Sequence, residues 1–138
     1  MVYKPLTYLR AHQIDQLHSL YKNEFWCNAR TKPDIEKMLK HSSIIIAFED
    51  ATENLIAFCR LLTDYTYKAT LYDLIVHPDY RGKQLGKLVM DAVFRHPELM
   101  DVEHIDLNCL PEMKAFYQHW GFTDEVGELI HMRYFSGK

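Results

Sequence analysis

The chain has 138 residues, a length typical of one compact domain, and 48% of them are apolar, enough to fill a single core. Its net charge of −3 and pI near 6.2 disfavour a nucleic-acid partner, which would need a dense basic surface. The longest apolar runs have only the length of strands, and the first residues lack the apolar stretch of a signal peptide. We therefore expect one cytoplasmic domain over residues 1–138, with no membrane role.

The cysteines and histidines do not form a recognisable metal or redox motif. Cys27, Cys59 and Cys109 are odd in number and widely spaced, which indicates neither a disulfide framework nor a CxxC site. None of the eight histidines has HExxH spacing or stands beside a cysteine in zinc-ligand order. The sequence therefore predicts reduced thiols and no bound metal.

Strands and helices are expected to alternate along the chain. Period-two patterns favour strands, apolar residues three and four apart favour helices, and Thr31 followed by Pro33 is typical of a helix start. Pro97 marks the end of a helix because it cannot continue the backbone hydrogen bonds. The expected strands are 3–9, 43–48, 55–62, 69–76, 102–107 and 129–135, and the expected helices are 11–22, a short one after Thr31, 85–96 and 112–120. A polar turn at 49–54 predicts a hairpin.

A short basic turn joins the strand at 69–76 to the helix at 85–96. The strand pattern breaks at His77 and Pro78, and Arg81, Lys83 and Lys87 follow. Backbone N–H groups at a helix start lack intrahelical partners, and the helix dipole leaves partial positive charge there. Such a turn is suited to binding a pyrophosphate through its amides, with the basic side chains adding charge.

This turn and a later segment together resemble the GCN5-related N-acetyltransferase (GNAT) family. The turn, from Arg81 to Gly86, is similar to the family's acetyl-CoA loop, which reads Arg/Gln-x-x-Gly-x-Gly/Ala. The segment from Tyr117 to Phe122 is similar to its Tyr-x-x-x-Gly-Phe signature. Gln84 stands where the family usually has its first glycine. If Gln84 already belongs to the first helical turn, its φ is negative and its amide still faces the phosphate.

The resemblance implies an α/β fold, the GNAT acyl-CoA N-acyltransferase fold. In that fold helices flank a mixed, twisted sheet whose central parallel strands, here 69–76 and 102–107, splay apart to admit the pantetheine arm of the co-substrate acetyl-CoA. The crossover helix makes these strands a right-handed unit with the ligand at their carboxyl ends. The implied cofactor-binding residues are Leu74, Ile75, Val76, Arg81, Gly82, Lys83, Gln84, Leu85, Gly86, Lys87, Asn108 and Phe116.

Acetyl transfer to an amine needs a proton for the departing thiolate and stabilisation of an oxyanion. Tyr117 occupies the family position whose phenol lies near the cofactor sulfur, and we predict it as the proton donor. The alternative is that Tyr117 merely packs its helix against the sheet. The oxyanion would be stabilised by a backbone N–H near Ile75.

Asp73 is the leading candidate for a general base. It is a carboxylate within an apolar strand, expected on the same face as Leu71 and Ile75, where burial favours a raised pKa or a bound cation. The alternative is a structural salt bridge. His77 is a weaker candidate for relaying a proton, because its place before Pro78 favours a turn residue.

The acceptor is expected to bind beside the loop between the first two helices. Phe25 and Trp26 are predicted to wall a pocket there, and Arg30 to hold a carboxylate or phosphate bidentately. Glu24 or Asp64 would attract a cationic amine. The alternative is that these aromatic residues cover the core.

We therefore expect an N-acetyltransferase that transfers an acetyl group to a primary amine of a small molecule by direct attack in a ternary complex. Two alternatives are a protein or peptide acetyltransferase acting on a lysine or an N-terminal amine, and a non-catalytic acyl-CoA-binding module. A cysteine hydrolase using Cys109 is remote, because nothing orders a histidine and a carboxylate around it. The apolar pattern at 129–135 makes a homodimer plausible.

Overall fold

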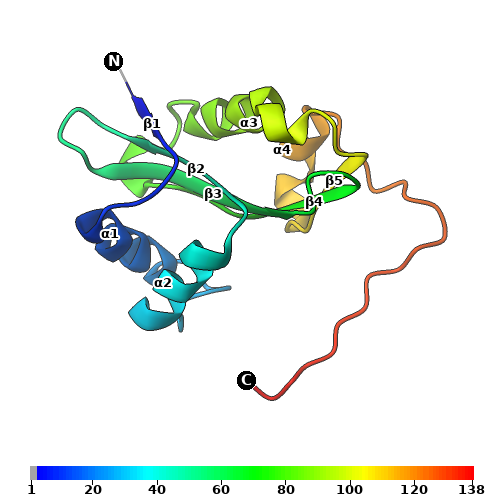
Figure 1. Cartoon of the computed structure of the whole chain (residues 1–138), viewed down its shortest axis with the longest axis horizontal. Coiled ribbons are helices and arrows are strands. Elements are labelled where there is room, and N and C mark those ends of the chain that lie inside the picture. Colours follow the sequence, from blue (N-terminus) through cyan, green and yellow to red (C-terminus); the bar gives the residue numbers. More distant parts are fainter. Residues whose placement is uncertain (1–2) are drawn as a thin grey trace. The chain divides into compact units, whose positions relative to one another are not determined.

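The computed structural model describes residues 3–138 of the chain, which divides into two compact units, Met1–Asn108 and Cys109–Lys138. The first unit contains the sheet and most of the helices. Its elements are β1 (Lys4–Leu6), α1 (Ala11–Lys22), α2 (Lys32–His41), β2 (Ile44–Glu49), β3 (Leu55–Thr63), β4 (Lys68–Val76), α3 (Leu85–Arg95) and β5 (His104–Leu107). Within this unit α1 and α2 cover one face of the sheet and α3 covers the other (Figure 1).

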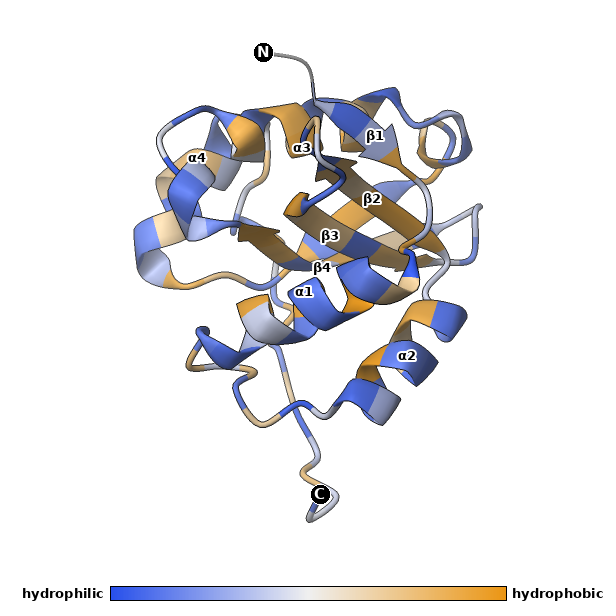
Figure 2. Cartoon of the chain, turned by 90° about the vertical axis from the view of Figure 1, so that its left-hand side faces the viewer, coloured by the Kyte–Doolittle hydropathy of each residue, from blue (hydrophilic) through white to orange (hydrophobic). Residues whose placement is uncertain are grey.

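Helices α1 and α2 form where the sequence predicts them, because capping and amphipathic spacing agree. Thr31 caps α2 by accepting a hydrogen bond from the Asp34 N–H at 3.3 Å. Helix α1 buries Leu17, Leu20 and Tyr21 together with the polar Gln13, and its outward side is mostly hydrophilic in the hydropathy colouring (Figure 2). Both helices therefore present one apolar stripe to the sheet.

The sheet has the order β1-β2-β3-β4-β5, with antiparallel neighbours except for the parallel pair β4 and β5. The parallel pairing runs only from Lys68 opposite His104 to Leu71 opposite Leu107. Strand β4 continues to Val76, so its second half has no partner in β5. The expected splaying of these two strands is confirmed, although β5 lies at the edge of the described sheet rather than at its centre.

A β-bulge interrupts β4 where the pairing with β5 has just ended. Arg60 of β3 lies opposite Tyr72, but Phe58 lies opposite Ile75, so β4 carries one extra residue between these pairs. Asp73 has a φ of +60°, in the left-handed region. The expectation that Asp73 shares a face with both Leu71 and Ile75 was therefore wrong, because a bulge breaks the period-two alternation between them.

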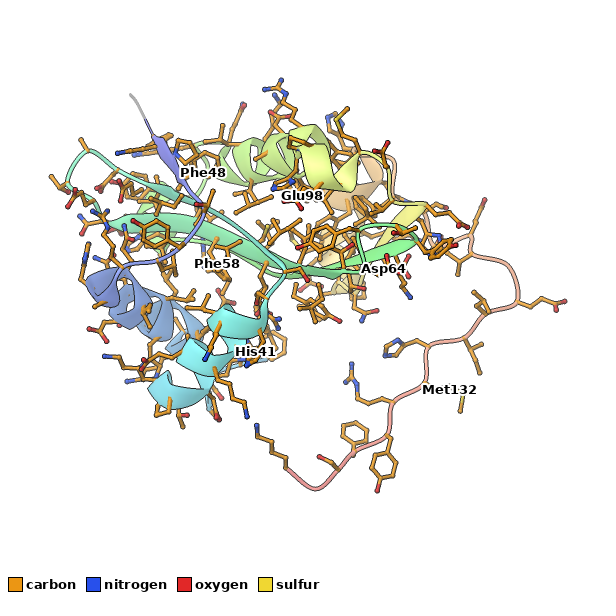
Figure 3. The ribbon with its side chains drawn as sticks, in the orientation of Figure 1. His41, Phe48, Phe58, Asp64, Glu98 and Met132 are labelled. Carbon is orange, nitrogen blue, oxygen red and sulfur yellow. The ribbon has the colours of Figure 1, made fainter. Side chains whose placement is uncertain are left out.

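The core of the first unit lies on both faces of the sheet. On the α1 side, Phe58 and Ile75 pack with Leu17, Tyr21 and Ile35. Helix α3 buries Leu85, Val89, Met90 and Val93, and its Leu88 and Ala92 are partly buried. Figure 3 labels Phe48 and Phe58, which come from the neighbouring strands β2 and β3.

The second unit contains one short helix, α4 (Lys114–Gln118), after a 3-10 turn at Pro111–Met113. The prediction of a strand at 129–135 was wrong: residues 128–138 contain neither helix nor strand. Their apolar side chains are exposed, including Met132, which Figure 3 labels. Alternating apolar residues are not sufficient for a strand, which also needs a neighbour to pair with its backbone.

Candidate active site

The turn before α3 has a backbone suited to binding an anion. Gly82 has a φ of +78° and Gln84, the residue before the helix, has a φ of +62°. The first helical hydrogen bond runs from the Leu88 N–H to the Gln84 carbonyl at 3.1 Å. The N–H groups of the three helical residues before Leu88 therefore have no intrahelical acceptor, and they stand at the positive end of the helix dipole.

The backbone of Gln84 differs from the sequence-based expectation. The residue precedes the first helical turn and its φ is positive, not negative. Only glycine adopts this conformation without a steric penalty, and for other residues the penalty is roughly 1 kcal/mol. The loop thus keeps the conformation for which glycine is the preferred residue, although the residue present is glutamine.

The basic side chains of the turn are exposed and bind neighbouring groups. Arg81 forms an ion pair with Glu24 at 3.2 Å and donates a hydrogen bond from Nε to the Val76 carbonyl at 3.3 Å. Lys83 lies over the ring of Tyr80, 5.2 Å from its centroid. Such exposed contacts are weak, so these cations can turn toward a phosphate.

The unpaired half of β4 leads directly into this turn. It contains Leu74, Ile75 and Val76, the residues predicted to offer backbone groups to pantetheine. The strand end is held by a hydrogen bond of 2.8 Å from the His77 N–H to the Ile56 carbonyl. Asn108, which is exposed, follows the last residue of β5. Asn108 and the unpaired half of β4 therefore both begin where the pairing of β4 with β5 ends.

Asp73 lies in a buried polar cluster, which we call the Asp73 cluster and which consists of Tyr21, Arg30, Arg60 and Asp73. The Asp73 side chain is only 5% exposed and accepts hydrogen bonds of 2.8 Å from both Arg30 and Arg60, and one of 3.0 Å from the Tyr21 hydroxyl. The guanidinium of Arg30 lies 4.6 Å from the ring centroid of Tyr21. The salt bridge considered as the alternative for Asp73 is thus present in the structure.

The cluster shifts the pKa values of its members. Burial acts to raise the pKa of Asp73, but the hydrogen bonds from Arg30 and Arg60 outweigh it and hold that pKa below its ordinary value. Burial, and then the charge of Asp73, raise the pKa of the Tyr21 hydroxyl. Burial likewise raises the pKa of the adjacent Cys27 thiol to about 11. At neutral pH Asp73 is an ionised and well-satisfied carboxylate, while Tyr21 and Cys27 are neutral.

Of the three residues predicted to bind the acceptor, Trp26 and Arg30 lie at this cluster and Phe25 does not. Trp26 is 42% exposed, lies edge-on to Tyr21 and stacks near Arg30, whereas Phe25 is 71% exposed. The carboxylate that Arg30 holds bidentately is Asp73 of the same chain. Trp26 and Arg30 therefore lie together, and Phe25 stands apart in solvent.

The two acidic residues suggested for attracting an amine have other partners. Glu24 is bound to Arg81 of the basic turn. Asp64, labelled in Figure 3, accepts hydrogen bonds from the backbone N–H groups of Thr66, Tyr67 and Lys68. Those bonds lower the pKa of Asp64 and organise the turn between β3 and β4.

Sequence reasoning missed Arg60, a member of the Asp73 cluster. A signal for it exists, because Arg60 interrupts the apolar run of β3 as Asp73 interrupts that of β4. A buried charge in each of two neighbouring strands indicates an ion pair between them. Arg60 also lies over the Tyr72 ring, 4.7 Å from its centroid.

The second unit contains the Tyr117 signature. Tyr117 is buried, and its ring makes edge contacts with Phe116 and Phe122, with centroids 5.1 and 5.9 Å away. The Phe122 N–H donates a hydrogen bond to the Tyr117 carbonyl at 3.2 Å, past Gly121 with its φ of +94°. The glycine thus ends the helix and returns Phe122 to the tyrosine.

No helix of residues 3–138 has both the length and the apolar character needed to cross a membrane. Within the same residues, no three or more histidine, cysteine or acidic side chains gather as metal ligands do.

The family model described as the acetyltransferase (GNAT) domain matches residues 40–124. An uncharacterized N-acetyltransferase, ycf52, of Porphyra purpurea is 33% identical over 115 residues, which cover 78% of this chain and 66% of that protein. GCN5-related N-acetyltransferase 2, chloroplastic, of Arabidopsis thaliana is 27% identical over 86% of this chain and 43% of its own length. The chain thus spans less than two thirds of these relatives.

Solved structures agree with the sequence relatives. A Xanthomonas campestris protein described as belonging to the GNAT family has a TM-score of 0.84 and 25% identity, covering 99% of this chain and 96% of its own. Glucosamine-6-phosphate N-acetyltransferase from Arabidopsis thaliana has a TM-score of 0.71 at 20% identity and shares the fold over 99% of both chains. Together with the splayed strands and the amide-lined turn, these matches show that the chain belongs to the GNAT family of N-acetyltransferases.

Proposed function

We propose that residues 1–138 form one N-acetyltransferase domain, which transfers an acetyl group from acetyl-CoA to a primary amine of a small molecule by direct attack in a ternary complex. The match of the family model across residues 40–124, which spans parts of both units, supports the single domain. The chloroplastic names of two Arabidopsis relatives make a plastid location an alternative to the cytoplasmic one.

One observation carries this proposal: the unpaired half of β4 runs straight into a turn whose helix-start amides lack partners. An extended pantetheine arm can use the free edge of Tyr72–Val76 as a strand would, and the pyrophosphate can then reach the amides of α3. Arg81, Lys83 and Lys87 supply charge, and Asn108 and Phe116 are proposed to complete the cofactor contacts.

The roles proposed for Tyr117 and Asp73 follow from the protonation state of each side chain. Tyr117 is proposed to protonate the departing thiolate, because a phenol with a pKa near 10 remains protonated at neutral pH. Asp73 is a poor general base, since its pKa is lowered and its oxygens accept from two arginines. We therefore assign Asp73 to positioning, and the amine loses its proton to water or before it binds.

A protein acceptor is the second candidate, favoured by one specific observation. The histone acetyltransferase TAP1 of Glycine max is 31% identical over 70 residues, which cover 51% of this chain and 30% of that protein. Phe25, Trp26 and Arg30 are proposed to contact the acceptor in either case. A homodimer formed through 129–135 remains a proposal.

The test is release of CoA from acetyl-CoA with a panel of polyamines, amino sugars, amino acids and lysine peptides. CoA should be separated by chromatography, because the exposed Cys109 would contribute to a thiol assay. Turnover with free amines supports the small-molecule assignment, whereas turnover with peptides alone selects the protein acceptor. Binding of CoA without any turnover would identify a non-catalytic module.

Tyr117→Phe tests the proton donor. We expect kcat to fall about tenfold to a thousandfold with little change in the Kd for CoA, as for loss of a positioned acid. Tyr134→Phe, an exposed tyrosine of the tail, is the matched control and should leave kcat unchanged. An unchanged kcat in Tyr117→Phe would remove the residue from the chemistry.

A further inference from the structure

The Asp73 cluster carries more positive than negative charge. Two guanidinium groups, of Arg30 and Arg60, meet one carboxylate, that of Asp73, whose side chain is 5% exposed. Tyr21, Cys27 and Cys59, which interact with Asp73 and have pKa values raised by burial, are neutral at pH 7. The nearby Glu24 does not restore the balance, because it forms its ion pair with Arg81. One positive charge is therefore left without a counter-charge.

The uncompensated positive charge lies mainly on Arg60. Arg30 is held on three sides, by both oxygens of Asp73, by the ring of Tyr21 and by that of Trp26. Arg60 donates to Asp73 only through Nε, and no described residue accepts a hydrogen bond from its two terminal nitrogens. No unbonded side-chain nitrogen in residues 3–138 is fully buried, so these terminal nitrogens keep contact with solvent although the side chain is only 13% exposed.

Arg60 lies where β4 separates from β5, next to the free strand edge proposed to bind pantetheine. Arg60 pairs across the sheet with Tyr72, the last residue before the bulge at Asp73. Pairing between β4 and β5 has ended at Leu71, so this is also where the strands separate. An amine held near the free edge of β4 would have its other substituents within reach of Arg60.

The held orientation of Arg60 suits one kind of ligand. Asp73 binds its Nε, and its Cζ lies over the Tyr72 ring, 4.7 Å from the centroid, so the two terminal NH2 groups present one N–H each as a fixed fork. Such a fork matches the two oxygens of a carboxylate or a phosphate, and a largely buried position strengthens the interaction relative to water. A neutral or cationic acceptor would leave the positive charge uncompensated.

We propose that the acceptor carries an anionic oxygen group, a carboxylate or a phosphate, close to its amine, and that Arg60 binds this group while Arg30 and Asp73 hold Arg60 in place. The inference rests on the proposed acetyltransferase function and names the class of its acceptor. Arg60 is thereby the residue that sets specificity, and Trp26 and Tyr72 flank the bound group.

The first test compares acceptors in matched pairs that differ only in the anionic group. We expect kcat/KM to be at least tenfold higher for 4-aminobutyrate than for butylamine, or for phosphoethanolamine than for ethanolamine, and the pair with the larger ratio distinguishes carboxylate from phosphate. Arg60→Gln should reduce that ratio about tenfold or more through KM, in the range for loss of a charge-assisted pair. Arg60→Lys, which keeps the positive charge but not the two parallel N–H donors, should retain part of that ratio.

The control is Arg95→Gln, which removes an exposed arginine at the end of α3 and should leave the ratio unchanged. Because each ratio is taken within one variant, a loss of folded protein cancels. A wild-type ratio near one, or an equal ratio in wild type and Arg60→Gln, overturns the inference while leaving the acetyltransferase function intact.

A binding measurement separates the inference from the proposed function. We expect phosphoethanolamine or 4-aminobutyrate to shift the NMR resonance of the Trp26 indole N–H and not to do so in Arg60→Gln. Such binding without any acetyl transfer would contradict the proposed function and keep the anion site. Absence of binding and of transfer would contradict both.

Discussion

Two buried carboxylates of the first unit, Glu49 and Asp73, have similar burial and opposite surroundings. Their side chains are 3% and 5% exposed, and both are bound by arginine. Glu49 is bound by Arg10 and by the side-chain amide of Gln13, and Arg10 also pairs with Glu53. The Glu49 group thus has a surplus of negative charge, whereas the Asp73 cluster has a surplus of positive charge.

The Glu49 group and the Asp73 cluster also differ in how many of their hydrogen-bond donors have an acceptor. The Gln13 amide is fully occupied: it donates to Glu49 and to the Glu53 carbonyl and accepts from the Arg10 N–H. Those bonds tie the start of α1 to the β2–β3 hairpin. The Asp73 cluster instead leaves both terminal NH2 groups of Arg60 without a described acceptor. A satisfied group indicates a structural role, and spare donors beside separating strands indicate a site.

The largest difference should appear when each carboxylate becomes an amide. Asp73→Asn leaves two guanidinium groups facing each other, and we expect the free energy of unfolding at pH 7 to fall by about 3 kcal/mol. Glu49→Gln leaves Arg10 paired with a second carboxylate, that of Glu53, and should cost about 1.5 kcal/mol. Urea denaturation of both variants measures this. Equal losses would remove the distinction between the two groups.

The unfolding free energies of wild type and Asp73→Asn should become equal in acid. The pKa of Asp73 is lower in the folded than in the unfolded chain, so its stabilisation is present above the unfolded value of about 3.9 and is lost as pH falls through the folded one. The gap in unfolding free energy should therefore hold from pH 7 to 5 and shrink below about pH 4. A gap that is constant down to pH 2 would show that Asp73 does not stabilise the fold through its charge.

The smallest effect concerns Glu53, which borders the Glu49 group and has a φ of +66°. Glu53→Gly relieves backbone strain and loses only an exposed ion pair with Arg10, so we expect a gain of about 0.5 kcal/mol in unfolding free energy. Glu53→Gln is the control that loses the ion pair alone, and it should change stability by less than about 0.5 kcal/mol. A clear loss in Glu53→Gly would mean that the Glu53 side chain is an essential partner of Arg10.

Most of the fold was predictable because its elements follow local rules. The helices at Ala11–Lys22 and Leu85–Arg95 and the strands of the hairpin form within a residue or two of the expected bounds, since their periodicity agrees with their packing. The strand expected at 129–135 failed because pairing is not a local property. The family was likewise predictable from the turn and the Tyr117 signature.

The site was only partly predictable. Asp73 and Arg30 were identified as candidates, but that they bind each other depends on a contact between residues 43 positions apart. The positive φ of Gln84 and of Asp73 is set by the loop and the bulge around them, and residue type alone would favour neither. The role of Arg60 could not be predicted from the sequence, because its contact with Asp73 depends on the bulge.

The bulge in β4 also has a consequence for how such a site can arise. Between the pairs Arg60–Tyr72 and Phe58–Ile75, β3 advances by two residues and β4 by three. A chain shorter by one residue here would pair continuously and keep every flanking side chain on its present face, because the alternation has period two. The sheet does not require the extra residue. A single in-frame insertion of one codon therefore separates an ordinary strand from one that turns a carboxylate toward two arginines.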